Sequence, residues 1–160
     1  MAKAVTVRAA NAADASELLA LFRALWPDER GHATHIRGLL TGAARTTTPL
    51  TLFVAVAQGK LVGFIEVGLR SHANGCDPSR SVGFLEGWYV ARGFRRLGVG
   101  GRLVAAAEKW CRARGCREMA SDTWSNHRLS IAAHRALGYQ IDGRYVNFRK
   151  TLRKVGSKSS

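Results

Sequence analysis

The stretch Arg95-Arg96-Leu97-Gly98-Val99-Gly100-Gly101 lies between a segment with strand character and one with helix character. The first amide groups of a helix have no partner within the helix, and the helix dipole adds positive potential at this end. Glycines let an anion approach these amides closely, and two arginines add full charges. The stretch therefore predicts a phosphate-binding turn. It is not a Walker loop, because no Gly-Lys-Ser/Thr follows, and its Arg-x-x-Gly-x-Gly spacing after antiparallel strands differs from a Rossmann fingerprint.

Strands and amphipathic helices flank this turn on both sides. Before it, β-branched and alternating residues predict four strands, over residues 4–9, 51–57, 61–69 and 81–90. After it, we expect a strand over residues 117–123 and two closing strands within residues 139–152. Apolar residues recur at helical spacing from Asn11 to Trp26, from Ile36 to Leu40, from Gly101 to Gly115 and over residues 129–137. This order predicts an α+β fold, a mixed sheet with helices on its faces.

The composition indicates one globular domain. A chain of 160 residues has the size of a single domain, and 46% hydrophobic residues are too many for a disordered chain. We place the domain at residues 1–152, followed by a basic tail, residues 153–160, that we expect to be disordered. No stretch approaches the ~20 apolar residues that span a bilayer, and the N-terminus lacks the apolar core of a secretion signal. We therefore expect a cytoplasmic protein without a membrane partner.

The formal net charge of +14 favours a polyanionic partner. Clustered lysines and arginines attract both nucleic acids and phosphorylated coenzymes, so charge alone leaves both open. A nucleic-acid-binding module would rest on the tail from Lys150 to Lys158, which is short and has no interleaved aromatic residues. Nucleic acid is therefore the less favoured partner.

The three cysteines, Cys76, Cys111 and Cys116, cannot form a complete disulfide framework. None has the spacing of a metal site. We expect reduced structural thiols and no metal.

Two motifs resemble one enzyme family. Arg95-x-x-Gly98-x-Gly100 resembles the pyrophosphate-binding motif of the GNAT acetyltransferases, and His134-Arg-Ala-Leu-Gly138-Tyr139 is similar to the family's Tyr-x-x-x-Gly-Phe ending. The resemblance implies the GNAT fold: a mixed central sheet of about six or seven strands, flanked by about four helices and splayed where acetyl-CoA binds. It also implies that acetyl-CoA is the co-substrate.

The same resemblance implies a set of residues that contact acetyl-CoA. These are Trp88, Tyr89, Val90, Arg95, Arg96, Leu97, Gly98, Val99, Gly100, Gly101 and His127. Ordinary strand packing is the alternative for the Trp88 and Tyr89 side chains, because only their backbones need to serve. His127 stands where an asparagine is usual, and His134 stands where many relatives place a tyrosine that can protonate the departing thiolate.

Four further stretches are similar to the aminoglycoside 6'-N-acetyltransferases in particular. They are Leu25-Trp26-Pro27, Asn74-Gly75-Cys76-Asp77, Phe84-Leu85-Glu86-Gly87 and Gly115-Cys116-Arg117-Glu118-Met119-Ala120-Ser121-Asp122-Thr123. The resemblance implies transfer of acetyl to the 6'-amine of aminoglycoside antibiotics, which confers resistance, and it implies a homodimer. The alternative within the same chemistry is another amine acceptor: a protein N-terminus, a lysine or a polyamine.

A polyamine substrate needs carboxylates around its ammonium groups, and this basic chain has only eleven acidic residues. Glu86 and Asp122, on neighbouring strands, are expected to face the cleft, and Trp26 can cover a sugar ring or attract an ammonium group. Each has an alternative: Glu86 pairs with an arginine on the sheet, Asp122 caps the following helix, and Trp26 belongs to the core. His72 and Asp142 complete the substrate-binding set that we expect from the resemblance, in which Gly143 takes the place of a late substrate-binding acid.

These residues support a direct-attack mechanism. The amine must lose a proton before it attacks the thioester, and we assign that proton to Asp122, directly or through water. Glu86 holds and orients the substrate, and the backbone N–H of Val90 receives the oxyanion. Asp122, Glu86 and Val90 are thus the expected catalytic residues, and no acyl-enzyme is required.

Overall fold

A computed structural model of the chain describes residues 4–44 and 46–152. Its centre is a five-stranded mixed sheet in the order β1-β2-β3-β4-β5. The first four strands are antiparallel neighbours, and the last is parallel to β4. The strands are β1 (Val5–Ala9), β2 (Leu50–Ala57), β3 (Lys60–Arg70), β4 (Val82–Val90) and β5 (Met119–Ser121). The predicted α+β class is confirmed.

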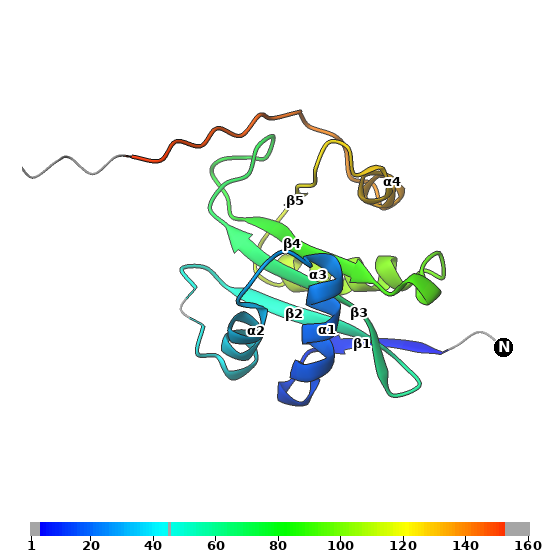
Figure 1. The fold of residues 1–160 in the computed structure, drawn as a ribbon. Coiled ribbons are helices and arrows are strands. Elements are labelled where there is room, and N and C mark those ends of the chain that lie inside the picture. The colour runs from blue at the N-terminus through cyan, green and yellow to red at the C-terminus, as the bar shows by residue number, and fades with distance from the viewer. Residues whose placement is uncertain (1–3, 45, 153–160) are drawn as a thin grey trace, which may run out of the picture.

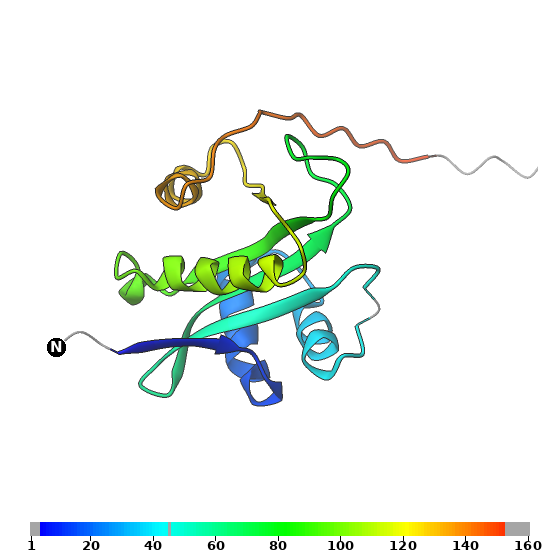
Figure 2. The same cartoon turned by 180° about the vertical axis from the view of Figure 1, so that it is seen from behind.

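The helices cover both faces of the sheet (Figures 1 and 2). One face carries α1 (Ala15–Leu25) and α2 (His32–Thr41), which pack Leu18, Phe22 and Ile36 onto Leu52, Val54 and Phe64. The other carries α3 (Val99–Arg112), whose buried residues pack against β2, β3 and β4. The remaining elements are α4 (Arg128–Ala136) and the 3-10 turns η1 (Ala12–Asp14) and η2 (Arg92–Phe94).

The sheet is splayed at one edge, as expected for this fold. β5 pairs with β4 only across the three positions from Gly83 to Leu85. The part of β4 from Glu86 to Val90 has no β5 partner, which leaves this edge open. η2 and the turn into α3 follow directly after it.

The two closing strands expected within residues 139–152 are not formed, so this prediction is wrong. The segment has no strand and leads away from the body of the domain (Figure 1). Strand propensity forms a strand only where a neighbouring edge accepts its hydrogen bonds. β5 is itself three residues long, against the seven expected. The described sheet therefore has five strands rather than six or seven, and the tail, residues 153–160, lies outside the described residues.

In the described ranges, the helices are all too short or too polar to span a bilayer.

Candidate active site

A β-bulge in the central hairpin aims Glu86 at the α1/α2 face. Along β3 and β4, Glu66 is paired with Gly87, but the next pair is Val67 with Leu85, so Glu86 is skipped. A skipped residue breaks the alternation of a strand and redirects its side chain. Glu86 thus shares a face with Gly87 rather than lying opposite it, and both Glu66 and Glu86 border one cavity.

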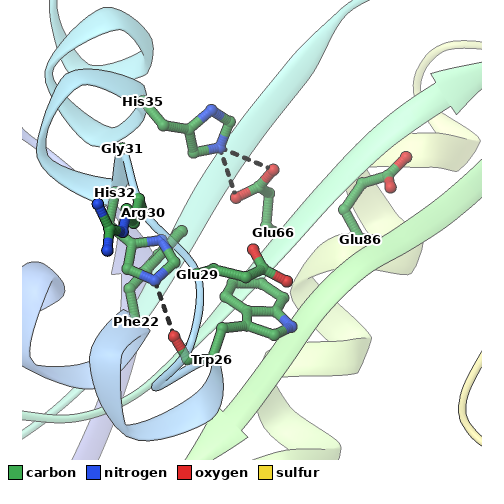
Figure 3. Close-up of a pocket in the computed structure, with 9 residues that line it drawn as sticks. All are labelled: Phe22, Trp26, Glu29, Arg30, Gly31, His32, His35, Glu66 and Glu86. Atoms are coloured by element: carbon green, nitrogen blue, oxygen red, sulfur yellow. Dashed lines mark hydrogen bonds and ion pairs between the residues drawn. The ribbon is translucent and has the colours of Figure 1, made fainter.

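This cavity, which we call the acceptor pocket, has a volume of about 430 Å³. That volume is in the range of small-ligand sites. It lies between the sheet and the first two helices (Figure 3). Its lining residues are Phe22, Trp26, Glu29, Arg30, Gly31, His32, His35, Glu66 and Glu86. Three carboxylates in one cavity of a protein with net charge +14 make this pocket suited to a cationic ligand.

Glu86 lines the acceptor pocket, and it also has the arginine partner that was its alternative. Arg70 donates from Nε to Oε1 at 2.9 Å and from Nη2 to Oε2 at 2.6 Å. The Arg70 guanidinium also lies 3.3 Å from the centroid of the Phe84 ring. Glu86 is therefore an oriented carboxylate at the pocket wall, with its side chain 28% exposed.

Trp26 likewise fits both of its interpretations. Its ring lines the acceptor pocket and packs 5.3 Å from the ring of Phe22, centroid to centroid. A Cβ added at Gly87 would collide with the same ring, so the glycine makes room for the indole. His32 bonds the Trp26 carbonyl at 3.0 Å and fixes the end of α1. The indole is thus anchored in the core and presents one side to the cavity.

Two pocket residues, Glu66 and His35, were not predicted from the sequence. His35 Nε2 lies 3.0 Å and 3.1 Å from the two carboxylate oxygens of Glu66. This bond raises the pKa of His35, because the carboxylate favours the protonated imidazole. The sequence contained an indication of this site. Glu66 is the one acidic residue in the apolar strand β3, and burying its charge there costs free energy unless the charge has a partner.

The other predicted substrate residues lie outside the acceptor pocket. Asp122 follows the last residue of β5 and is exposed, and His72 is exposed in the loop between β3 and β4. Asp142 accepts a hydrogen bond from the Tyr145 hydroxyl at 3.0 Å. It also lies against Gly75, so the C-terminal segment contacts the loop between β3 and β4. The N-cap of α4 is His127, so Asp122 does not cap that helix.

The turn into α3 has the features of an anion site. The helix begins at Val99 after Gly98, whose φ of +75° favours glycine, and no side chain caps the first amides. A Cβ at Gly100 would lie 2.7 Å from the Trp88 ring, so only glycine lets helix and strand come this close. The buried Trp88 Nε1 has no hydrogen-bond partner among the described residues. Free backbone donors without a blocking side chain fit a diphosphate group.

Arg95 has a structural contact within this turn. Its Nε donates to the Val90 carbonyl at 2.8 Å, and its guanidinium lies 5.6 Å from the Tyr89 ring centroid. Arg96 and Leu97 are exposed beside it. His127 is exposed at the start of α4, with its Nδ1 3.4 Å from the Thr123 hydroxyl.

The Val90 N–H points toward the open edge of the sheet. Ala91 donates to the Val62 carbonyl at 2.8 Å, and the next pair along the hairpin is Val90 with Gly63. Hydrogen-bonded and non-bonded pairs alternate in an antiparallel ladder, so the amide of Val90 faces away from β3. β5 does not reach this position, and a donor is thereby available where the two strands separate.

His134 is held near the same edge. Its Nδ1 lies 2.7 Å from the Ser130 carbonyl, which makes Nδ1 the donor, and its Nε2 lies 2.9 Å from the Ser121 hydroxyl. The ring packs edge-on against Trp88, with centroids 5.4 Å apart. These contacts fix the imidazole beside the strand that the resemblance assigns to acetyl-CoA.

The cysteines remain free thiols. Cys111 and Cys116 are buried and Cys76 is half-buried. Burial raises the pKa of Cys111 to about 12, which makes it a poor nucleophile. Across residues 4–44 and 46–152, no group of three or more His, Cys, Asp or Glu side chains is arranged to hold a metal ion.

Comparison with known proteins converges on one family. The model of the acetyltransferase (GNAT) family matches residues 15–139. An aminoglycoside N(6')-acetyltransferase type 1 of Klebsiella aerogenes is 41% identical over 149 residues, covering 91% of this chain and 96% of the relative. An aminoglycoside N(6')-acetyltransferase type 1 of Stenotrophomonas maltophilia is 40% identical over 153 residues, covering 95% of this chain and 97% of the relative.

Solved structures agree with these sequence relatives. The structure of AAC(6')-Iy in complex with the bisubstrate analog CoA-S-monomethyl-acetylneamine is 34% identical, with a TM-score of 0.83 over 93% of this chain and 99% of that chain. The aminoglycoside antibiotic 6'-N-acetyltransferase AAC(6')-Ih from Acinetobacter baumannii is 31% identical, with a TM-score of 0.83 over 94% and 100%.

Proposed function

This chain belongs to the GNAT acetyltransferase family, and from that premise we propose that it is an aminoglycoside 6'-N-acetyltransferase. The observation that carries the acceptor class is the acceptor pocket, where three carboxylates gather in a strongly basic protein. Aminoglycosides are polycations, and ammonium groups are recognised by carboxylates. The relatives from Klebsiella aerogenes and Stenotrophomonas maltophilia carry this activity in their names and align over more than nine-tenths of the chain.

Acetyl-CoA fits the turn into α3. The uncapped amides from Val99 onward would bond the diphosphate, and Gly98 and Gly100 would let it approach. The exposed Arg96 would add positive charge, while Arg95 would hold the turn through the Val90 carbonyl. Acetyl-CoA supplies an activated acyl group, and the protein's own task is to bring an amine to it. Trp88, Tyr89 and Val90 would line the donor, with His127 at the α4 side.

The acceptor amine reacts by direct attack on the acetyl carbon. The amine loses a proton to Asp122, directly or through water, and attacks the acetyl carbon to form the new C–N bond and a tetrahedral oxyanion. Collapse of this oxyanion breaks the C–S bond and releases the thiolate of coenzyme A. Glu86 orients the substrate from the pocket wall, and the outward-facing Val90 N–H stabilises the oxyanion. Alignment of two bound reactants supplies much of the acceleration. Trp26 covers a sugar ring, and His72 and Asp142 bind substrate beyond the pocket.

The product explains a role in resistance. Acetylation turns an ammonium group into a neutral amide, which removes one of the positive charges with which a polycation binds its target. We place this activity in the cytoplasm, where free thiols such as the three cysteines of this chain persist.

We propose a homodimer, with the C-terminal segment, residues 139–152, as its interface. Tyr145, Val146 and Phe148 are 63%, 76% and 94% exposed, far more than a monomer ordinarily leaves of such side chains in one segment. Strand character without a strand partner supports pairing with a second copy.

Thiol release from acetyl-CoA tests the proposed function. Purified protein should release free thiol with kanamycin or tobramycin, with an acetyl group found on the 6'-nitrogen by mass spectrometry and NMR. Activity confined to a lysine peptide, a protein N-terminus or spermidine would instead establish the alternative acceptor. No thiol release with any amine would contradict acetyl transfer altogether.

A further inference from the structure

Among the residues that the structure describes, the Glu66 carboxylate lacks a full set of hydrogen-bond partners. It is 5% exposed, and its two oxygens share one donor from these residues, Nε2 of His35, at 3.0 Å and 3.1 Å. An ionised carboxylate has about four acceptor positions. Glu86 on the neighbouring strand is better satisfied, because Arg70 gives each of its oxygens a separate bond. Glu66 thus keeps unused acceptor capacity at the wall of the acceptor pocket.

A buried carboxylate of this kind is costly without a partner. Burial of a charge is tolerated where the charge is paired and hydrogen-bonded, and one shared N–H is a weak compensation. Glu66 borders the acceptor pocket, and its neighbours on β3 from Leu61 to Gly68 are buried. An ammonium group entering that pocket would supply up to three further donors.

His35 is suited to give way to such a group. It lies on α2 rather than on the sheet, and its side chain is 41% exposed, against 7% for Glu66 (Figure 3). Its ring can therefore turn to solvent while Glu66 stays in place. The bond to Glu66 raises the pKa of His35, so its proton depends on that carboxylate.

We propose that Glu66 is a second ammonium-binding carboxylate of the acceptor pocket, and that His35 is the counter-ion that an ammonium group of the substrate displaces. This inference rests on the proposed function, which supplies the polycation. Because Glu66 is paired with Gly87, next to Glu86, the two carboxylates lie on adjacent strands at nearly the same level. They can therefore hold two neighbouring ammonium groups of one ligand.

The other charged groups at the pocket set the electrostatic background for His35. The loop between α1 and α2 contributes Glu29 and Arg30, the start of α2 contributes His32, and β4 contributes Glu86 with its partner Arg70. α1 contributes only the uncharged Phe22 and, at its end, Trp26. Of the charged groups at the pocket, Glu66 is the one that hydrogen-bonds to His35. Loss of this bond is therefore expected to be the main cause of any change in the charge of the His35 imidazole.

Kinetics of Glu66→Gln give the first test. The amide keeps the shape of the side chain but not its charge, so KM for kanamycin should rise at least tenfold. kcat at saturating kanamycin and KM for acetyl-CoA should change less than twofold. Glu108→Gln, which removes a carboxylate on α3 that pairs with Arg112, is the matched control and should leave all three unchanged.

A proton count gives the second test. Kanamycin binding is measured by calorimetry in two buffers with different ionisation enthalpies, at a pH slightly above 6.5. Wild type should release up to about half a proton more than His35→Asn, because displaced His35 returns toward its ordinary pKa near 6.5 and is then about half protonated at this pH. Proton exchange by the antibiotic itself is common to both proteins and cancels in the difference. His35→Asn should also bind kanamycin at least twofold more tightly.

The outcomes separate this inference from the proposed function. A wild type that neither acetylates nor binds kanamycin contradicts the proposed function, and this inference with it. An active wild type with an unchanged KM in Glu66→Gln overturns this inference alone. If Glu66→Gln does not fold, the proton count of wild type against His35→Asn decides, and equal counts overturn the inference. If the Glu66–His35 ion pair were purely structural, its loss would lower the stability of the protein but would change neither KM for kanamycin nor the proton count.

Discussion

Arg70 holds the Glu86 carboxylate by two separate hydrogen bonds, of 2.9 Å and 2.6 Å, at the wall of the acceptor pocket. Glu86 is the bulged residue of β4, and Arg70 is the last residue of β3, so the sheet itself positions both partners. The pair leaves the carboxylate 28% exposed toward the cavity. An ammonium group can therefore bind a carboxylate whose direction is already fixed.

Loss of this carboxylate should weaken acceptor binding. Glu86→Ala is expected to raise KM for kanamycin ten- to hundredfold, since a hydrogen bond to a charged group contributes about 1.5 to 3 kcal/mol. Steady-state kinetics with each substrate varied in turn measure this effect, and KM for acetyl-CoA should not move. A rise in KM for acetyl-CoA instead would place Glu86 at the donor site.

Asp122→Asn should slow the chemical step. The amide cannot accept the proton of the amine, so kcat with kanamycin should fall at least tenfold. Asp122 is exposed, so the melting temperature should stay within a few degrees. Asp77→Asn, at an exposed acid in the loop before β4, is the control and should keep full turnover. Unchanged turnover in Asp122→Asn would remove this residue from the role of base.

Gly100→Ala should damage the turn into α3. The added Cβ lies 2.7 Å from the Trp88 ring, which must shift, and overpacking of this kind costs about 1 to 3 kcal/mol. KM for acetyl-CoA should rise severalfold, and urea unfolding should show the lost stability. Gly93→Ala is the matched control, because no other described residue outside its chain neighbours has an atom within 4 Å of the Cβ that this substitution adds. Equal effects of the two substitutions would contradict the close approach of helix and strand.

The Arg8–Asp14 pair should make stability depend on pH. Arg8 donates to both Asp14 oxygens, at 2.7 Å and 2.8 Å, and these bonds hold the pKa of Asp14 below its usual value. A carboxyl whose pKa is lower in the folded state stabilises it fully above about pH 4 and loses this effect as the pH falls through the folded pKa.

Unfolding in urea at pH 7, 4 and 3 checks this dependence. Asp14→Asn should be about 1 to 3 kcal/mol less stable than wild type at pH 7, because charged hydrogen bonds and an N-terminal cap of η1 are lost. The difference should narrow toward pH 3. A gap that is independent of pH would show that packing, and not the charge, is responsible.

Phe148→Asp should weaken the proposed homodimer. Phe148 is 94% exposed in a segment that has no strand partner in the described chain. A charge at this position opposes burial between two copies, so light scattering should find a smaller mass than for wild type at the same concentration. Thr47→Asp adds the same charge at an exposed position outside residues 139–152 and should leave the mass as in wild type. A wild type that is monomeric throughout would contradict the proposed interface.

Two residues of the acceptor pocket were expected from the sequence because they lie in short stretches that resemble the aminoglycoside 6'-N-acetyltransferases. These stretches are Phe84-Leu85-Glu86-Gly87 and Leu25-Trp26-Pro27. Glu66 and His35 escaped prediction because they are 31 positions apart and have no shared motif. Likewise, the alternation in residues 139–152 indicated strands, but it could not show whether any edge of the same chain would receive them.

By itself, the sequence determined the class of fold, the glycine-rich turn into α3 and the order of the elements as far as α4. Hydrophobic periodicity, glycines with positive φ and helix ends are properties of neighbouring residues, so they are visible in the chain. The tertiary structure decided which charges share a cavity. The skipped residue Glu86, the approach of His35 to Glu66 and the outward N–H of Val90 all depend on register between strands and on helix placement. Those are relations between distant segments, and only packing of the whole domain fixes them.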